Sequence, residues 1–165
     1  MNTCTRLFAV MVLAALALPG FAESFAFKSA EGRFAITFPA QPRQTTEQQK
    51  EGTVHLYVLD HGGGAWVASY SDLPKQKRSG GRVRALDQWA KGAASGGELR
   101  KDARVKVSGA SGREVLVGLD KNQVRRQRVL IAKGRLYQII YVGPAGSEAT
   151  AAVNGFFDSF RLQQR

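Results

Sequence analysis

The feature that most constrains the fold is a run of four strand-like segments in the second half of the chain. These segments are residues 98–107, 112–119, 124–132 and 136–142, and only short Ser-Gly, Asp-Lys-Asn and Lys-Gly stretches separate them. Because such short turn-forming connections join antiparallel neighbours, we predict a series of β-hairpins. The last segment, LYQIIYV, is apolar on both faces apart from Gln138, which predicts a central strand that is covered on both sides.

The first half of the chain carries further strand patterns. In residues 33–38, Phe34, Ile36 and Phe38 alternate with other residues and so share one face. We predict additional strands at 25–28, 53–59 and 65–70, with a glycine-rich hairpin turn at 60–64. The polar stretch 41–50 has no apolar alternation and is predicted to be a loop.

Two segments have helical periodicity. Leu86, Trp89, Ala90 and Ala93 predict a helix over residues 83–94, which the Ser-Gly-Gly stretch 95–97 ends. A second helix is predicted after Ser147, the expected N-cap, with a core-facing stripe at Ala149, Ala152, Val153, Phe156, Phe157 and Phe160. The predicted fold class is therefore α+β, with an antiparallel sheet of about six or seven strands and helices packed on its faces.

The first 22 residues have the pattern of a secretory signal. Arg6 is their only charge, an apolar run follows it, and Gly20 and Ala22 place small residues before a cleavage point. The run is shorter than the roughly 20 residues that span a bilayer. We predict cleavage near Ala22, a periplasmic or secreted protein, and no transmembrane segment in the mature chain. An uncleaved membrane anchor is the alternative.

Cysteine usage and length bound the mature chain. Cys4 is the only cysteine and would leave with the signal, so no disulfide or thiolate site is expected. Residues 23–165 are predicted to form a single domain, because a chain of that size buries roughly two-thirds of its unfolded surface.

The chain is strongly basic, with a net charge of +11, which favours contact with anionic partners. The candidate anion-binding residues are Lys75, Lys77, Arg78, Arg82 and Arg84 in a predicted exposed loop, together with Arg126 and Arg128. The last two should share a sheet face, with Arg125 on the opposite one. The alternative is a solvated charged face without a specific ligand. No nucleic acid is expected, because aromatic residues do not interleave with the basic clusters.

No known catalytic, metal or cofactor pattern is present in the sequence. His61 and the three glycines after it resemble an esterase oxyanion loop, but no G-x-S-x-G nucleophile accompanies them. His55 and His61 are the only histidines, too few for a zinc site without other converging ligands. Glycine-rich phosphate-binding motifs are missing as well. We therefore predict no catalytic residue, no metal and no cofactor.

Several stretches resemble a group of small bacterial exported proteins whose function is largely unknown. These are GRFAITFPAQP, ASYSDLP, SGREVLVG, GRLYQIIYVGP and FFDSFRL, and together they extend over nearly the whole mature chain. The fold of that group is similar to that of the PsbP and Mog1 proteins, which implies a PsbP/Mog1-like α/β/α sandwich. PsbP-type proteins include extrinsic photosystem subunits, and Mog1 is a nuclear-transport factor. The resemblance therefore implies a binding or accessory role and assigns no functional residue.

Three functions remain open from the sequence. The first is an exported non-catalytic binding or accessory module with a protein partner. The second is an envelope-associated protein that binds anionic lipid or polymer through its basic loops. The third is an enzyme of unrecognised type.

Overall fold

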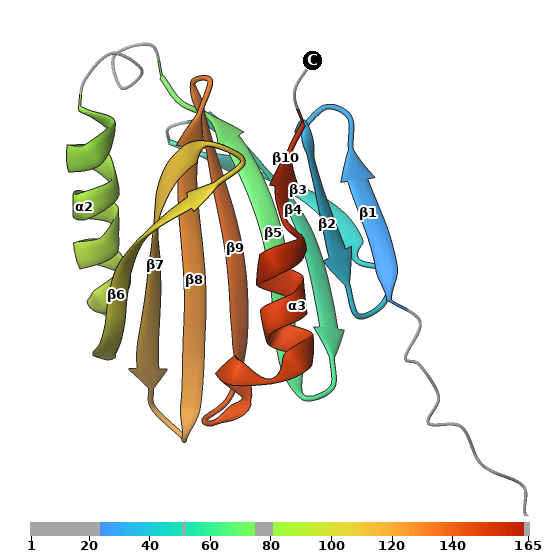
Figure 1. Ribbon diagram of the computed structural model, residues 1–165, viewed down its shortest axis with the longest axis vertical. Coiled ribbons are helices and arrows are strands. Elements are labelled where there is room, and N and C mark those ends of the chain that lie inside the picture. Colours follow the sequence, from blue (N-terminus) through green and yellow to red (C-terminus); the bar gives the residue numbers. More distant parts are fainter. Residues whose placement is uncertain (1–23, 51, 75–80, 164–165) are drawn as a thin grey trace, which may run out of the picture.

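A seven-stranded antiparallel sheet forms the centre of the molecule (Figure 1). The computed structural model describes residues 24–50, 52–74 and 81–163. The strands follow the order β3-β4-β5-β9-β8-β7-β6. Their bounds are β3 Arg43–Gln49, β4 Gly52–His61, β5 Gly64–Asp72, β6 Glu98–Val107, β7 Ala110–Leu119, β8 Gln123–Ala132 and β9 Arg135–Pro144.

Four tight turns connect strands of this sheet that are consecutive in the chain, as the short separators predict. Both central residues of each turn have positive φ, which is the requirement of a type I′ turn. The four turns are Gly62-Gly63, Ser108-Gly109, Lys121-Asn122 and Lys133-Gly134. The predicted series of antiparallel hairpins from 98 to 144 is confirmed.

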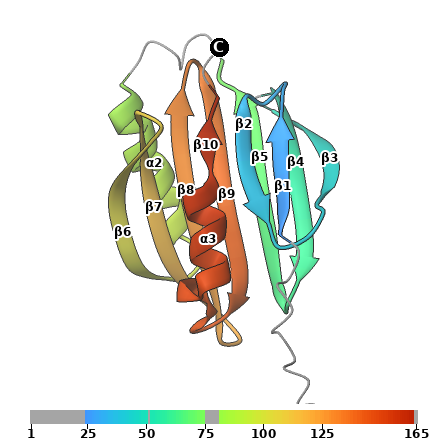
Figure 2. The same ribbon diagram turned by 45° about the vertical axis from the view of Figure 1, so that its right-hand side comes forward.

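A smaller sheet and a helix cover one face of the large sheet (Figure 2). The smaller sheet has the order β1-β2-β10, with bounds β1 Phe25–Ser29, β2 Phe34–Phe38 and β10 Arg161–Leu162. Beside it lies α3 (Ala151–Ser159), whose Val153, Phe156 and Phe157 are buried. The alternating residues Phe34, Ile36 and Phe38 also point into this core, as predicted.

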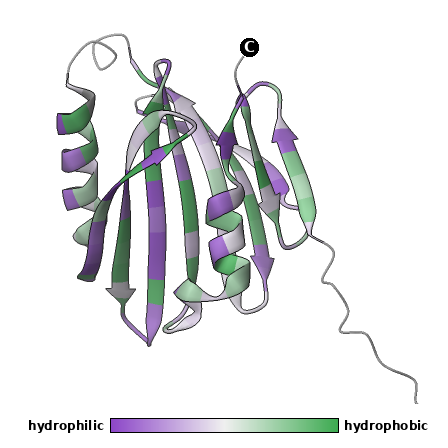
Figure 3. Ribbon diagram, in the orientation of Figure 1, coloured by the Kyte–Doolittle hydropathy of each residue, from purple (hydrophilic) through white to green (hydrophobic). Residues whose placement is uncertain are grey.

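The opposite face carries the other helix, α2 (Arg82–Ala94). Figure 3 shows hydrophobic and hydrophilic residues alternating around this helix. Its Leu86 packs against Val129 and Ile131 of β8, and its Ala90 packs against Val115 and Val117 of β7. The α+β fold class, with helices on both faces of an antiparallel sheet, is confirmed.

The strand β9 is central, between β5 and β8, but the prediction that it is covered on both sides is wrong for most of its length. Tyr137, Ile139 and Tyr141 are buried under the smaller sheet and α3. Ile140 and Val142 on the other face are only half-buried. The physical reason is that α2 packs over β7 and β8 and reaches β9 only at Leu136.

The predicted loop at 41–50 is wrong, because Arg43–Gln49 forms the edge strand β3. Every side chain of β3 is exposed, so this strand has no buried face that would leave an apolar alternation in the sequence. Its backbone pairs with β4 in a continuous antiparallel register. Polar and charged side chains are a common protection for such an edge.

The predicted N-cap at Ser147 is also wrong. Ser147 begins a short 3₁₀ turn, Ser147–Ala149, and the true N-cap of α3 is Thr150, whose Oγ1 accepts a hydrogen bond from the Val153 N–H at 3.4 Å. Ser147 instead lies 2.8 Å from the hydroxyl of Tyr141. The predicted stripe is buried at Val153, Phe156, Phe157 and Phe160, whereas Ala149 and Ala152 are exposed.

We expect Thr150→Ala to lower the free energy of unfolding by about 1 kcal/mol, because an unsatisfied N–H remains at the start of α3. Urea unfolding followed by circular dichroism measures this loss. Thr46→Ala on the exposed strand β3 is the control and should change stability by less than about 0.5 kcal/mol. Equal effects of the two substitutions would contradict the assigned cap.

Some predictions fall on residues outside the described part of the chain. These are the signal segment 1–22 with Cys4, and Lys75, Lys77 and Arg78 of the basic loop. Among the described residues, no helix is long and apolar enough to cross a membrane.

Candidate functional site

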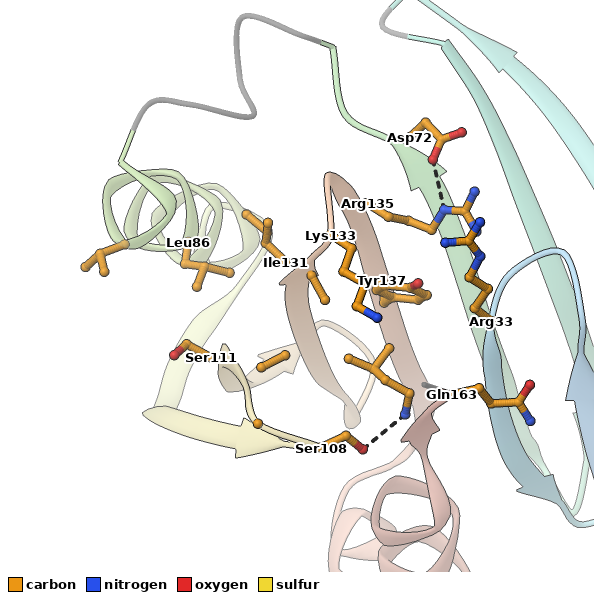
Figure 4. A pocket seen from close by; sticks show the side chains of 15 residues that line it. Arg33, Asp72, Leu86, Ser108, Ser111, Ile131, Lys133, Arg135, Tyr137 and Gln163 are labelled. Atoms are coloured by element: carbon orange, nitrogen blue, oxygen red, sulfur yellow. Dashed lines mark hydrogen bonds and ion pairs between the residues drawn. The ribbon is translucent and has the colours of Figure 1, made fainter. Parts of the chain in front are cut away.

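A cavity of about 780 Å³ opens where several elements end at one edge of the molecule (Figure 4). We call this cavity the first chamber. It lies between α2, the end of β5, the β6–β7 and β8–β9 turns, the start of β2 and the C-terminal segment after β10. Its lining includes Arg33, Asp72, Val83, Leu86, Ser111, Ile131, Lys133, Arg135 and Tyr137.

Backbone hydrogen bonds hold the rim of the first chamber together. The Gln163 N–H donates to the carbonyl of Arg33 at 2.9 Å, and the Leu73 N–H donates to the carbonyl of Gly134 at 2.9 Å. The Leu162 N–H donates to the Oγ of Ser108 at 3.1 Å. These bonds involve five segments that are distant in the sequence, so the chamber is a product of the tertiary fold.

Arg135 and Asp72 form the fixed part of the rim. The Nε of Arg135 lies 2.9 Å from Asp72 Oδ1, and its Nη1 donates to the carbonyl of Glu31 at 2.6 Å. The guanidinium also lies over the ring of Tyr70, 4.6 Å from its centroid. Burial acts to lower the pKa of Arg135, but the hydrogen bond and charge of Asp72 outweigh it and raise the pKa. Arg135 is therefore a charged, held side chain.

Arg33 and Lys133 form the open part of the rim. Both are exposed, and both have a positive φ at the turn that precedes a strand. Within the described residues, no carboxylate lies at ion-pair distance from either of them. Figure 4 shows Arg33 beside Arg135, with Lys133 between these arginines and the α2 side of the chamber. The two side chains can therefore meet an external anion.

The inner wall is apolar apart from one phenol. Leu86 of α2 and Ile131 of β8 are buried there, and Tyr137 is 4 % exposed. Burial raises the pKa of Tyr137, against the opposing charge of Arg135. The phenol is therefore neutral at physiological pH and is a hydrogen-bonding group rather than a base. In the ranges described, no three His, Cys, Asp or Glu side chains gather as a metal site would require.

A solved structure with a similar fold is known. A cyanobacterial PsbP protein, CyanoP from Synechocystis sp. PCC 6803, superimposes with a TM-score of 0.55, over 91% of this chain and 98% of that one, at 13% identity. The fold is PsbP-like. This agrees with the resemblance found in the sequence, and at such low identity it describes the fold alone.

A second structure aligns with the PsbP-like domain less completely. It is a protein of unknown function from Pseudomonas aeruginosa, called a putative regulator, with a TM-score of 0.45, 11% identity and coverage of 76% of this chain and 85% of that one. No protein-family model matches the chain, and no curated protein matches it in sequence.

The PsbP-like domain places the predicted anion-binding residues in different environments. Lys75, Lys77 and Arg78 lie outside the described residues, as does the side chain of Arg82. The predicted loop is wrong for Arg82 and Arg84, because α2 already begins at Arg82. Arg84 is exposed on the first turn of α2 and does not line the chamber. Anion binding by these five residues stays a prediction.

Arg126 and Arg128 share one sheet face, as predicted, and both bind Glu114 on the neighbouring strand β7. Their side chains are only 15% and 9% exposed, with guanidinium nitrogens 3.0 Å and 2.6 Å from the Glu114 carboxylate oxygens. Arg126 also donates to Asn154 at 2.7 Å, and Arg128 donates to the carbonyl of Phe157 at 2.7 Å. Their donors are occupied within the domain, so we leave both arginines out of the candidate site.

Arg33, Lys133 and Arg135 do not stand out in the sequence, because none of them belongs to a long basic run. A signal for two of them was present in the hairpin pattern. Lys133 lies in the predicted β8–β9 turn and Arg135 directly after it. The β6–β7 turn lies at the same end of the sheet, because turns alternate between the two ends of an antiparallel series. Arg33 comes from the separate smaller sheet and could not be placed this way.

Proposed function

We propose that the protein is an exported, non-catalytic binding module, and that the first chamber binds an anionic group of a protein partner. The observation that carries this proposal is the pair Arg33 and Lys133, which are exposed and have no carboxylate partner among the described residues. Hydrogen bonds from a charged donor to an anion are among the stronger polar interactions in proteins.

The neighbouring groups suit recognition rather than turnover. Asp72 is engaged by Arg135, so it does not repel an incoming anion at full strength. The phenol of Tyr137, with its raised pKa, offers a hydrogen bond without acting as a general base at neutral pH. The apolar wall at Leu86 and Ile131 provides a dry surface beside the cations. The secretory pattern of residues 1–22 supports export.

The test is affinity capture from an envelope extract. The bait is the full chain with an affinity tag inserted after residue 23. This position precedes β1 at the end of that strand away from the β1–β2 turn and the chamber (Figure 1). The variant is Arg33→Glu with Lys133→Glu. The matched control is Lys91→Glu with Lys121→Glu, an equal change of charge in the last turn of α2 and in the β7–β8 turn.

We expect the wild type and the control to retain one protein in near-equal amount at both low and physiological salt. The chamber variant should retain it about tenfold less or worse, because hydrogen bonds to charged groups contribute about 1.5–3 kcal/mol each. If both variants lose the captured material equally, net charge governs binding and the anionic lipid or polymer alternative is favoured. If neither loses it, the chamber is not the binding site.

A further inference from the structure

A second cavity of about 370 Å³ adjoins the first chamber. We call it the second chamber, and it lies between α2 and the strands β6 and β7. The two chambers share Val83, Leu86 and Ser111, so they form one continuous groove along the N-terminal half of α2. Val83 is 55% exposed, one of the few large apolar side chains of the domain that face solvent. The middle of the groove is therefore an open apolar floor.

Cations line both ends of this groove. In the second chamber Arg104 and Lys106 lie on the same face of β6, opposite Arg113 and Ser111 of β7. Both are exposed, and within the described residues neither lies at ion-pair distance from a carboxylate. Arg113, in contrast, binds Asp87 of α2 at 2.8 Å and Asp102 of β6.

The balance of charge along the groove is strongly positive. Among the described residues, its lining includes six cations, Arg33, Lys133, Arg135, Arg104, Lys106 and Arg113, and two carboxylates, Asp72 and Asp87. Both carboxylates are engaged by arginines, so at each end two cations have no carboxylate partner within the part of the chain that the structure describes. A complementary ligand carries negative charge at both ends and an apolar group between them.

We propose that the groove binds an extended acidic segment of a partner protein, with an apolar side chain on Val83 and Leu86 and carboxylates on either side. This inference rests on the proposed function and adds the class and length of the ligand. Residues i and i+2 of an extended strand lie about 6.8 Å apart, so Arg104 and Lys106 match carboxylates at alternate positions of an extended peptide. A phospholipid with a single phosphate, such as phosphatidylglycerol, carries one charged head, which leaves the second cationic end without a partner.

The experiment selects binders from a library of random peptides displayed on phage, with the immobilised full chain as the target. We expect the selected peptides to contain Asp or Glu on both sides of an apolar residue. The affinity of a synthetic copy is then measured by fluorescence anisotropy for wild type, Arg33→Gln/Lys133→Gln, Arg104→Gln/Lys106→Gln and the control Lys91→Gln/Lys121→Gln. Each groove variant should bind about tenfold more weakly, and the control should equal wild type.

Separate outcomes overturn separate claims. If only Arg33→Gln/Lys133→Gln loses affinity for the peptide, the proposed function stands but the extended ligand is overturned. If neither groove variant loses affinity, both the proposed function and the extended ligand are overturned. Selection of peptides without acidic residues, or of no peptide, overturns the acidic segment, and tight binding to phosphatidylglycerol vesicles alone would favour a lipid surface instead.

The apolar floor has its own test. Val83→Ser should lower the affinity for the selected peptide. It should not lower the affinity further for a copy of that peptide whose central apolar residue is replaced by serine. Additive effects of these two changes would contradict a direct contact, because side chains that touch are coupled in a double-mutant cycle.

Discussion

Glu114→Ala should lower the free energy of unfolding by about 3–5 kcal/mol, because it leaves the buried Arg128 and the half-buried Arg126 without their shared counter-charge. Glu114 is 7% exposed and accepts hydrogen bonds from both Arg126 and Arg128. These arginines in turn bind α3, through Asn154 and the carbonyl of Phe157, and both lie over the ring of Phe157. Loss of the carboxylate therefore weakens the attachment of α3 to the sheet.

Urea unfolding followed by tryptophan fluorescence measures the loss at Glu114. The control is Asp60→Ala, which removes an ion pair with Arg43 whose side chains are 66% and 69% exposed. That change should stay within about 1 kcal/mol, because exposed pairs are screened by solvent.

A second variant separates charge from packing. Glu114→Leu with Arg126→Met and Arg128→Met should be far more stable than Glu114→Ala, since no buried charge remains. Equal instability of the two would contradict the electrostatic cause.

This network shows why part of the structure could not be read from the sequence. The alternation of residues correctly placed Arg126 and Arg128 on one face and Arg125 on the other. Their counter-charge was not visible, because Glu114 becomes their neighbour only through the register of β7 and β8. A shift of one residue in that register would have turned Glu114 to the opposite face. Two arginines that appeared free to bind an external anion are therefore internal.

The strands that the sequence predicted are those in which burial leaves a periodic pattern. Residues 33–38 alternate because one face of that strand is covered more fully than the other. The four segments after residue 97 are rich in apolar or strand-forming residues, and turn-forming residues mark their ends. The strand β3 leaves no such pattern, since all of its side chains are exposed. The groove was missed for a related reason. Its residues come from several separate elements, and no local pattern records that they converge.

Phe34→Ala should lower the free energy of unfolding by about 3–5 kcal/mol, the range for removing a large buried aromatic side chain. Phe34 is 0% exposed and belongs to β2 of the smaller sheet. Its ring contacts aromatic rings of five other strands or segments, with centroid distances of 6.0 Å to Phe27, 5.7 Å to Tyr57, 6.2 Å to Tyr70, 6.2 Å to Tyr137 and 5.4 Å to Phe160. It therefore joins the smaller sheet to the large one.

The matched control for Phe34→Ala is Phe25→Ala, on the neighbouring strand β1 of the same sheet, where the ring is only partly buried. Phe25→Ala should lower the free energy of unfolding clearly less than Phe34→Ala, because folding removes less of the apolar surface of Phe25 from water. Urea unfolding compares the two variants.

Phe34 also directly follows Arg33 and packs on Tyr137, both of which line the first chamber. Phe34→Leu, which keeps most of the buried volume, should therefore retain peptide binding. Equal losses for Phe34→Ala and Phe25→Ala would show that the aromatic cluster does not join the sheets, and the position of Arg33 would then need another support.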